Sequence, residues 1–141
     1  MEDIRLLSLL TDMSRFHAAY VEHRLMHLGI HSGQGAIISA LGEYGPCSQK
    51  ELAEYRHVSA ATISVMLGRM EKSGLVIRST SEDGKSNHIT LTETGLAMYE
   101  ALRKDTEGEP KRVFAGLTKD ELAVAEKVFQ TVAENLATMT Q

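Results

Sequence analysis

The sequence predicts a mainly α-helical fold that carries one small β-hairpin. Apolar residues recur at helical spacing through most of the 141 residues, and only two prolines interrupt them. Residues 75–91 differ, because two runs rich in β-branched side chains flank a polar turn with a glycine at its tip. With 43% hydrophobic residues, no internal repeat and no Ser/Gly-rich linker, we expect residues 1–141 to form a single domain.

The N-terminal part is expected to form two helices. Residues 3–28 contain neither proline nor glycine, and Gly29 suits the position just after a helix end. Two apolar stripes run along this segment and suggest burial on more than one side: Leu6, Leu10, Met13, Phe16 (or His17) and Tyr20 in one, and Val21, Leu25 and Leu28 in the other. A second helix is expected over residues 33–41, followed by a turn over residues 42–46.

The middle of the chain predicts two short capped helices and then the hairpin. Ser48 and Glu51 fit a capping box for a helix that runs to about Tyr55, and Ser59 can cap a second helix over residues 60–72. That second helix should face inward with Ile63, Met66, Leu67 and Met70. Strands are expected over residues 75–78 and 88–91. Helix, tight turn, helix and hairpin is the order of a winged helix-turn-helix, whose second helix can enter the major groove of DNA.

The C-terminal part is expected to be helical and to mediate self-association. Thr92 can cap a helix that runs to about Glu107, residues 108–110 break the pattern, and Thr118 with Glu121 forms another capping box. The last helix carries an apolar seam with steps of three and four: Leu122, Ala125, Phe129, Val132, Leu136 and Met139. We expect the terminal helices of two chains to interleave through Leu6, Leu10, Met13, Leu122, Phe129, Val132, Leu136 and Met139. The alternative is a last helix that packs on its own domain.

The middle segment resembles the DNA-binding lobe of the MarR family, bacterial regulators named for multiple antibiotic resistance. The order and spacing of several short matches over residues 33–95 support this resemblance, and the flanking helices also suit the family. The matches are Gly33-Gln34, Gln49-Lys50-Glu51-Leu52-Ala53-Glu54, Ala61-Thr62-Ile63-Ser64, Met70-Glu71-Lys72-Ser73-Gly74-Leu75-Val76, Asp83 and Leu91-Thr92-Glu93-Thr94-Gly95. The resemblance implies a winged-helix lobe and following helix over residues 33–107 and dimerisation helices over residues 1–32 and 108–141.

The expected DNA contacts come from helix starts, the second helix of the motif and the hairpin. The exposed face of residues 60–65 is small and uncharged, so its methyl and hydroxyl groups can approach base edges. The candidates are Ser48, Gln49, Ser59, Ala60, Ala61, Thr62, Ser64, Val65, Arg69, Arg78, Ser81, Asp83, Lys85 and Asn87. Two departures from the family stand out: Val65 replaces a polar or basic residue of many relatives, and Lys85 replaces the usual wing arginine. A solvated turn is the alternative for the hairpin tip.

The distribution of charge matters more than its sum. The formal net charge is –4, but residues 48–90 carry +1, against –2 for residues 1–47 and –3 for residues 91–141. Binding to phosphates should therefore be modest and sensitive to salt, with uncharged contacts from hydroxyls and helix N-termini.

Three further sites are considered as sensors. His23 and His27 share a helix face at a spacing that can hold Zn²⁺, with His31 as a third ligand; the alternative is polar surface histidines. Cys47 precedes a helix N-terminus that could lower its pKa for oxidant sensing; the alternative is a small loop residue. The resemblance also implies a small organic, often aromatic, effector near Phe16, His17, Tyr20 and Arg24; the alternative is core aromatics and a solvated arginine.

The sequence favours a homodimeric, sequence-specific transcriptional regulator, a repressor released by a small ligand or stress signal. A winged-helix interaction module without DNA binding is one rival, which the acidic net charge and Val65 favour. An enzyme is another, but no glycine-rich cofactor loop, paired-carboxylate site or nucleophile–base pair supports it, and no cofactor is expected. One cysteine, no signal peptide and no membrane-length apolar run are typical of a cytoplasmic protein.

Overall fold

The computed structural model describes residues 2–84 and 87–140. The chain divides into two compact units, Met1–Asp105 and Thr106–Gln141. The first unit holds five helices, α1 to α5, and a three-stranded antiparallel sheet. The second holds α6 and α7. This composition confirms a mainly α-helical fold with a small β wing.

The first two helices differ from expectation at their ends. Helix α1 spans Glu2–Met26 and ends earlier than expected, because Gly29 has a positive φ of 72° and the amide of Ile30 turns back to the Leu25 carbonyl. Helix α2 spans Ser32–Tyr44, so the turn expected from residue 42 was wrong. The helix continues through Gly42 because this face lies against the ring of Tyr99, which a Cβ at position 42 would overlap. It ends at Gly45, where φ is 80°.

The two short helices of the central motif follow their predicted caps. Helix α3 spans Gln49–Arg56 and α4 spans Ala60–Lys72. The Ser48 hydroxyl accepts the Glu51 amide at 3.0 Å, and the Glu51 carboxylate accepts the Ser48 amide at 3.3 Å, which confirms the capping box. Between the helices, His57 is the only described residue other than glycine with a positive φ, at 52°. This left-handed residue closes the tight turn of the helix-turn-helix.

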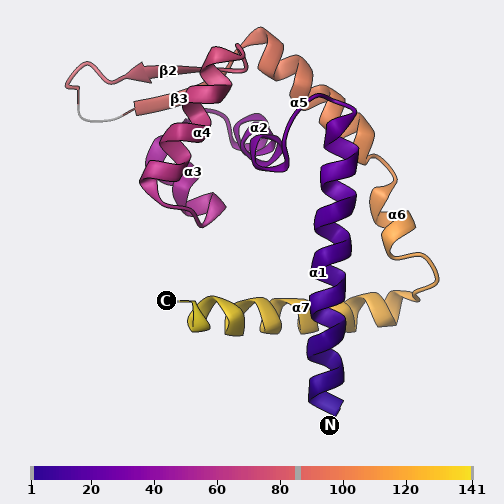
Figure 1. Cartoon of the computed structure of the whole chain (residues 1–141). Coiled ribbons are helices and arrows are strands. Elements are labelled where there is room, and N and C mark those ends of the chain that lie inside the picture. Colours follow the sequence, from indigo (N-terminus) through magenta and orange to yellow (C-terminus); the bar gives the residue numbers. More distant parts are fainter. Residues whose placement is uncertain (1, 85–86, 141) are drawn as a thin grey trace. The chain divides into compact units, whose positions relative to one another are not determined.

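The predicted hairpin is confirmed and joins a third, unpredicted strand. Strand β2 spans Val76–Thr80 and pairs antiparallel with β3, Asn87–Leu91. The two-residue strand β1, Cys47–Ser48, pairs with the other edge of β3, giving the order β1-β3-β2. Two residues carry no strand pattern of their own, so β1 could not be seen in the sequence. Figure 1 shows β2 and β3 projecting beyond α3 and α4 as a wing.

The core of the first unit locks α4 in place by one face. Each of eight large side chains exposes less than 2% of its surface: Ile37, Ile38, Leu52, Ile63, Leu67, Met70, Val76 and Ile89. Burying each is worth about 1.5–3 kcal/mol. Met66 of α4, expected to face inward with Ile63, is only half-buried. Its side chain packs against the start of α2, where a Cβ on Gly33 would lie 3.0 Å from the Met66 Cε. The opposite face of α4 therefore turns outward.

Helix α5, Glu93–Thr106, is tied to the end of α4. The Thr92 hydroxyl donates to the Gly74 carbonyl and accepts the Gly95 amide at 3.0 Å, while the Thr92 amide donates to the Leu75 carbonyl at 3.1 Å. Gly95 sits so close that a Cβ there would overlap the Leu75 carbonyl oxygen. The Leu91–Gly95 segment therefore joins wing, α4 and α5 at a single point.

The second unit contains α6, Glu109–Val113, and α7, Lys119–Met139. The Thr118–Glu121 capping box is present as predicted. Neither helix buries a residue, and the seam is left open, with Leu122 37%, Phe129 44%, Leu136 43% and Met139 77% exposed. Across residues 2–84 and 87–140, none of the helices combines the length and apolarity that a bilayer crossing requires.

Candidate nucleic-acid interface

The outward face of α4 is small and carries no carboxylate in its first three turns. Ala60, Ala61 and Thr62 are exposed, Val65 exposes 58% of its surface, and Ser64 is half-buried. A shallow depression of about 360 Å³ lies on this face, lined by Ala61, Thr62, Val65, Met66 and Arg69. Short side chains of this kind allow a helix backbone to lie deep in a groove.

The N-terminus of α4 is fixed by two hydroxyl groups. The Ser59 hydroxyl accepts the Thr62 amide at 3.1 Å and donates to the Thr62 hydroxyl oxygen at 2.9 Å. This cap satisfies one of the free amides of the first turn, and the others remain with the positive end of the helix dipole. Such a helix start favours a bound anion such as a phosphate.

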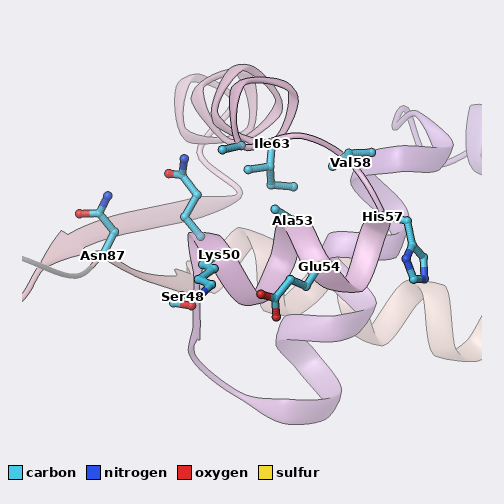
Figure 2. A pocket seen from close by; sticks show the side chains of 10 residues that line it. Ser48, Lys50, Ala53, Glu54, His57, Val58, Ile63 and Asn87 are labelled. Atoms are coloured by element: carbon cyan, nitrogen blue, oxygen red, sulfur yellow. The ribbon is translucent and has the colours of Figure 1, made fainter. Parts of the chain in front are cut away.

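A larger groove of about 780 Å³ runs between α3 and the start of α4 (Figure 2). Ser48 and Asn87 lie toward one end of the groove, and His57 and Val58 lie at the other end, while Gln49 also lines it. Lys50 and Glu54 come from successive turns of α3. Sequence reasoning missed Lys50 and His57 in this groove. The capping box could have indicated Lys50, since it fixes residue 50 in the first turn of α3.

The described part of the wing tip is a tight polar turn. The Ser81 hydroxyl donates to the Asp83 carboxylate, and the Gly84 amide donates to the Ser81 carbonyl at 2.8 Å. Asn87, at the start of β3, is exposed, and its side-chain oxygen accepts the Thr80 hydroxyl at 3.3 Å. Lys85, the candidate wing cation, lies outside the described residues.

Arg78 was expected among the DNA contacts, but the structure turns it toward the protein. Its guanidinium donates to the Ser64 carbonyl at 3.1 Å and to the Gln49 side-chain oxygen at 3.4 Å. Only 24% of its side chain is exposed. Arg78 pairs across the sheet with the fully buried Ile89, and directly opposite residues share a face. Its guanidinium therefore lies against α3 and α4, and nothing in this geometry tests the expected DNA contact.

Cys47 lacks the features of an activated thiol. It is buried in β1, and its Sγ–H donates to the Gly45 carbonyl at 3.3 Å. Burial, and secondly the negative charge of Glu51, raises the pKa of the Cys47 thiol above its usual value. The hypothesis of a pKa lowered by the helix N-terminus was wrong, because burial and the nearby carboxylate outweigh the dipole. The thiolate that oxidants attack is disfavoured here.

The histidine pair on α1 forms a ring contact. The rings of His23 and His27 meet edge to face, with centroids 5.2 Å apart, and both side chains are exposed. Within the part of the chain that the structure describes, no three His, Cys, Asp or Glu side chains are grouped as a metal site would need. His31, the expected third ligand, lies beyond the end of α1 and is exposed.

The four residues considered for an effector separate into two pairs. Tyr20 and Arg24 are half-buried, with the guanidinium 5.8 Å from the ring centroid. Arg24 also forms an ion pair with Asp105 of α5 at 3.0 Å, so it is not simply solvated. Phe16 and His17 are exposed, with Phe16 at 64%. The aromatic ring of Phe16 is therefore not core.

The expected dimer residues of α1 also lie open. Leu6 exposes 64% of its surface and Met13 50%, while Leu10 is half-buried. The seam residue Val132 of α7 is half-buried as well. Each unit by itself thus leaves an apolar helix face uncovered.

Comparisons with known proteins agree with this architecture. The family model described as MarR family matches residues 30–86, from the start of α2 to the wing. The HTH-type transcriptional repressor IacR of Pseudomonas putida is 28% identical over 131 residues, which cover 90% of this chain and 78% of IacR.

Two solved structures share the fold. AbsC, a MarR family transcriptional regulator from Streptomyces coelicolor, matches with a TM-score of 0.85 and 23% identity, covering 94% of this chain and 93% of AbsC. A mutant form of MarR from E. coli, complexed with operator DNA, matches with a TM-score of 0.82 and 22% identity, covering 93% of this chain and 95% of MarR. With its capped helix-turn-helix and its three-stranded wing, the chain matches the MarR family over residues 30–86 and shares the fold of MarR family transcriptional regulators.

Proposed function

We propose that this protein is a cytoplasmic, homodimeric repressor that binds a pseudo-palindromic operator and is released by a small organic ligand or a stress signal. The observation that carries the proposal is the outward face of α4. Its side chains over residues 60–65 are small and uncharged, Ser59 caps the helix, and the buried opposite face holds the helix in place. A helix of this kind can enter the major groove, because no large or acidic side chain on this face keeps its backbone away from the bases.

Base readout is assigned to the first two turns of α4. The methyl groups of Ala60, Ala61 and Val65 suit the thymine methyl, and the hydroxyls of Thr62 and Ser64 can bond either base type. Without arginine or asparagine at position 65, strong bidentate readout from that position is absent. Specificity should therefore depend on apolar contact and on the shape of the DNA.

Phosphate contacts are assigned to the groove beside α3, to Arg69 and to the wing. Ser48, Gln49, Lys50 and Asn87 line the groove, and Ser59 caps α4. In the wing, the phosphate contacts are assigned to Ser81, Asp83 and Lys85. Arg78 is not included, because its guanidinium donates hydrogen bonds to α3 and α4. These few cations predict a modest dependence of affinity on salt.

Dimerisation is assigned to the open apolar faces of α1 and α7. Exposed apolar helix faces are typical of association surfaces. Leu6, Leu10 and Met13 contribute from α1, and Leu122, Phe129, Val132, Leu136 and Met139 from α7. A two-fold dimer would present two copies of α4 to two half-sites.

Repression and release rest on two separate observations. Repression rests on the relative from Pseudomonas putida, which is named a repressor. Release is assigned to an organic effector that binds near Phe16, His17, Tyr20 and Arg24, close to the ion pair of Arg24 with Asp105. A ligand carboxylate that competes for Arg24 would loosen the link between α1 and α5.

The test is a mobility-shift assay with the duplex that flanks the protein's own coding region. We expect a discrete complex at submicromolar protein, and no complex with a scrambled duplex of the same length and base composition. If the folded protein binds no duplex above the scrambled control, a winged-helix interaction module without DNA binding becomes the better account.

A further inference from the structure

Arg78 of β2 joins the three elements of the DNA-binding lobe. Its Nη2 donates to the Ser64 backbone carbonyl of α4 at 3.1 Å, and its Nη1 donates to the Gln49 side-chain oxygen of α3 at 3.4 Å. Its Nε lies 3.8 Å from the carboxylate of Glu71 near the end of α4. One guanidinium fork thus contacts the wing's neighbours on both helices.

The absence of a side chain at Gly68, in the middle of α4, leaves room for the Arg78 guanidinium. A Cβ at position 68 would lie 3.2 Å from Nη2 of Arg78, tighter than an ordinary contact. Ser64 is one helical turn earlier, so the guanidinium lies along the helix surface over both residues. Glycine is unfavourable inside a helix, and the space needed by the Arg78 guanidinium is a physical reason for glycine at position 68.

The contact is buried enough to be structural. Arg78 exposes 24% of its side chain, and its Nε is buried without a hydrogen-bond partner among the described residues. The Gln49 carboxamide that it contacts also lines the groove between α3 and α4. The residue thus connects β2 of the wing to α3 and α4, which carry the candidate DNA surface.

We propose that Arg78 is a positioning residue that fixes the wing relative to α3 and α4 and does not itself bind phosphate. This proposal rests on the proposed DNA-binding function. The planar guanidinium is needed for this role and a positive charge alone is not enough, because a single ammonium group cannot hold α3 and α4 in one geometry.

The first experiment separates positioning from phosphate binding. Arg78→Lys keeps the charge without the fork, and Arg78→Met keeps the apolar stem without the charge. Affinity is measured over a range of salt for a duplex that wild-type protein selects from a random pool, and for a scrambled duplex. Arg69→Met, at an exposed arginine of α4, is the matched control for loss of a phosphate contact.

Both Arg78 variants should bind the selected duplex about ten-fold more weakly, with little change on the scrambled duplex and an unchanged salt slope. Arg69→Met should weaken both duplexes and reduce the salt slope by about one. A lysine variant that restores wild-type affinity, together with a methionine variant that loses about one unit of slope, would assign Arg78 to phosphate and overturn the proposal.

The second experiment needs no DNA. Gly68→Ala is introduced into wild-type protein and into Arg78→Met, and the melting temperature is measured. With Arg78 present, the new methyl group should cancel the gain that alanine normally brings to a helix. With Arg78 removed, Gly68→Ala should raise Tm by about 3–5 °C. Lys72→Ala, at an exposed residue of the same helix, should shift Tm equally in both backgrounds.

An equal shift for Gly68→Ala in both backgrounds would show that Arg78 does not bear on α4, and would contradict the proposal. If Arg78→Met fails to fold, Arg78→Lys replaces it in the cycle, since it also removes Nη2. If wild-type protein binds no duplex, the proposed function fails, while the Tm cycle still decides whether Arg78 joins the wing to α4.

Discussion

Single side chains decide what the proposed DNA-binding surface of α4 can recognise. Thr62 is oriented by its bond to the Ser59 hydroxyl, whereas Val65 offers two methyl groups on the open face of α4. The surface therefore has few groups that distinguish guanine from adenine. Most of its discrimination is expected to come from thymine methyl contacts and from close approach of the helix.

Val65→Arg tests this reading of α4. Arginine can bond guanine bidentately, so the variant should prefer a different base at one symmetric pair of positions, by about 1–3 kcal/mol per contact. Site selection from a random duplex pool measures the preference for both proteins. Lys72→Arg, elsewhere on α4, should leave the consensus unchanged. Identical consensus sequences for wild type and Val65→Arg would mean that residue 65 does not face the bases.

Cys47 illustrates how burial opposes a helix dipole. Since the pKa of the thiol is raised, less thiolate exists at pH 8 in the folded protein than in the unfolded chain. Alkylation by iodoacetamide at pH 8 should therefore be markedly slower in native protein than in urea. The native rate should continue to rise above pH 9. A native rate that reaches its plateau below pH 8.5 would contradict this environment.

At the scale of the elements, local signals were readable in the sequence and long-range ones were not. Both capping boxes are local patterns, and both were confirmed. Helix α2 runs beyond its expected end because Gly42 packs on Tyr99, fifty-seven residues later in the chain. Strand β1 exists only through its pairing with β3. Such partners cannot be found from spacing alone.

The candidate site shows the same division. The cap at Ser59 followed from its hydroxyl just before the helix, and the outward face of α4 followed from helical periodicity. The inward position of Arg78 was readable in principle, since it alternates with the buried Val76 along β2, but its charge suggested a DNA contact. The groove that Lys50 and His57 line exists only because the turn after His57 brings the start of α4 beside α3.

Gly95→Ala tests the junction of wing, α4 and α5. The new Cβ would overlap the Leu75 carbonyl oxygen, which accepts the Thr92 amide, so backbone must move. We expect a loss of about 3 kcal/mol in the free energy of unfolding, measured by urea denaturation. Thr94→Ala, an exposed position in the same turn, should change stability by about 0.5 kcal/mol or less. Equal stability of Gly95→Ala and wild type would refute the junction.

At the scale of the whole molecule, charge and association act together. The net charge of –4 lies mainly outside residues 48–90. A dimer would therefore present two copies of residues 48–90, the least acidic part of the chain, to DNA. The second copy doubles the number of cations available for phosphate contacts. In a single chain, apolar side chains of α1 and of α7 remain exposed.

Leu136→Glu tests the association surface. A charge in a buried seam should cost more than the about 2–5 kcal/mol of a leucine-to-alanine truncation. Sedimentation at micromolar concentration should give a dimer for wild type and monomer or unfolded chain for the variant, with loss of DNA binding. Asn135→Glu adds the same charge at the neighbouring position, off the seam, and should remain dimeric. A dimeric Leu136→Glu protein would remove α7 from the interface.

Site selection from a random duplex pool, with the number of chains per duplex measured by sedimentation, shows whether a dimer binds a two-fold operator. We expect a two-fold symmetric consensus with half-site centres about 10–10.5 base pairs apart, or a multiple of that spacing, and two chains on each duplex. An unenriched pool, or a single asymmetric site bound by one chain, would contradict it.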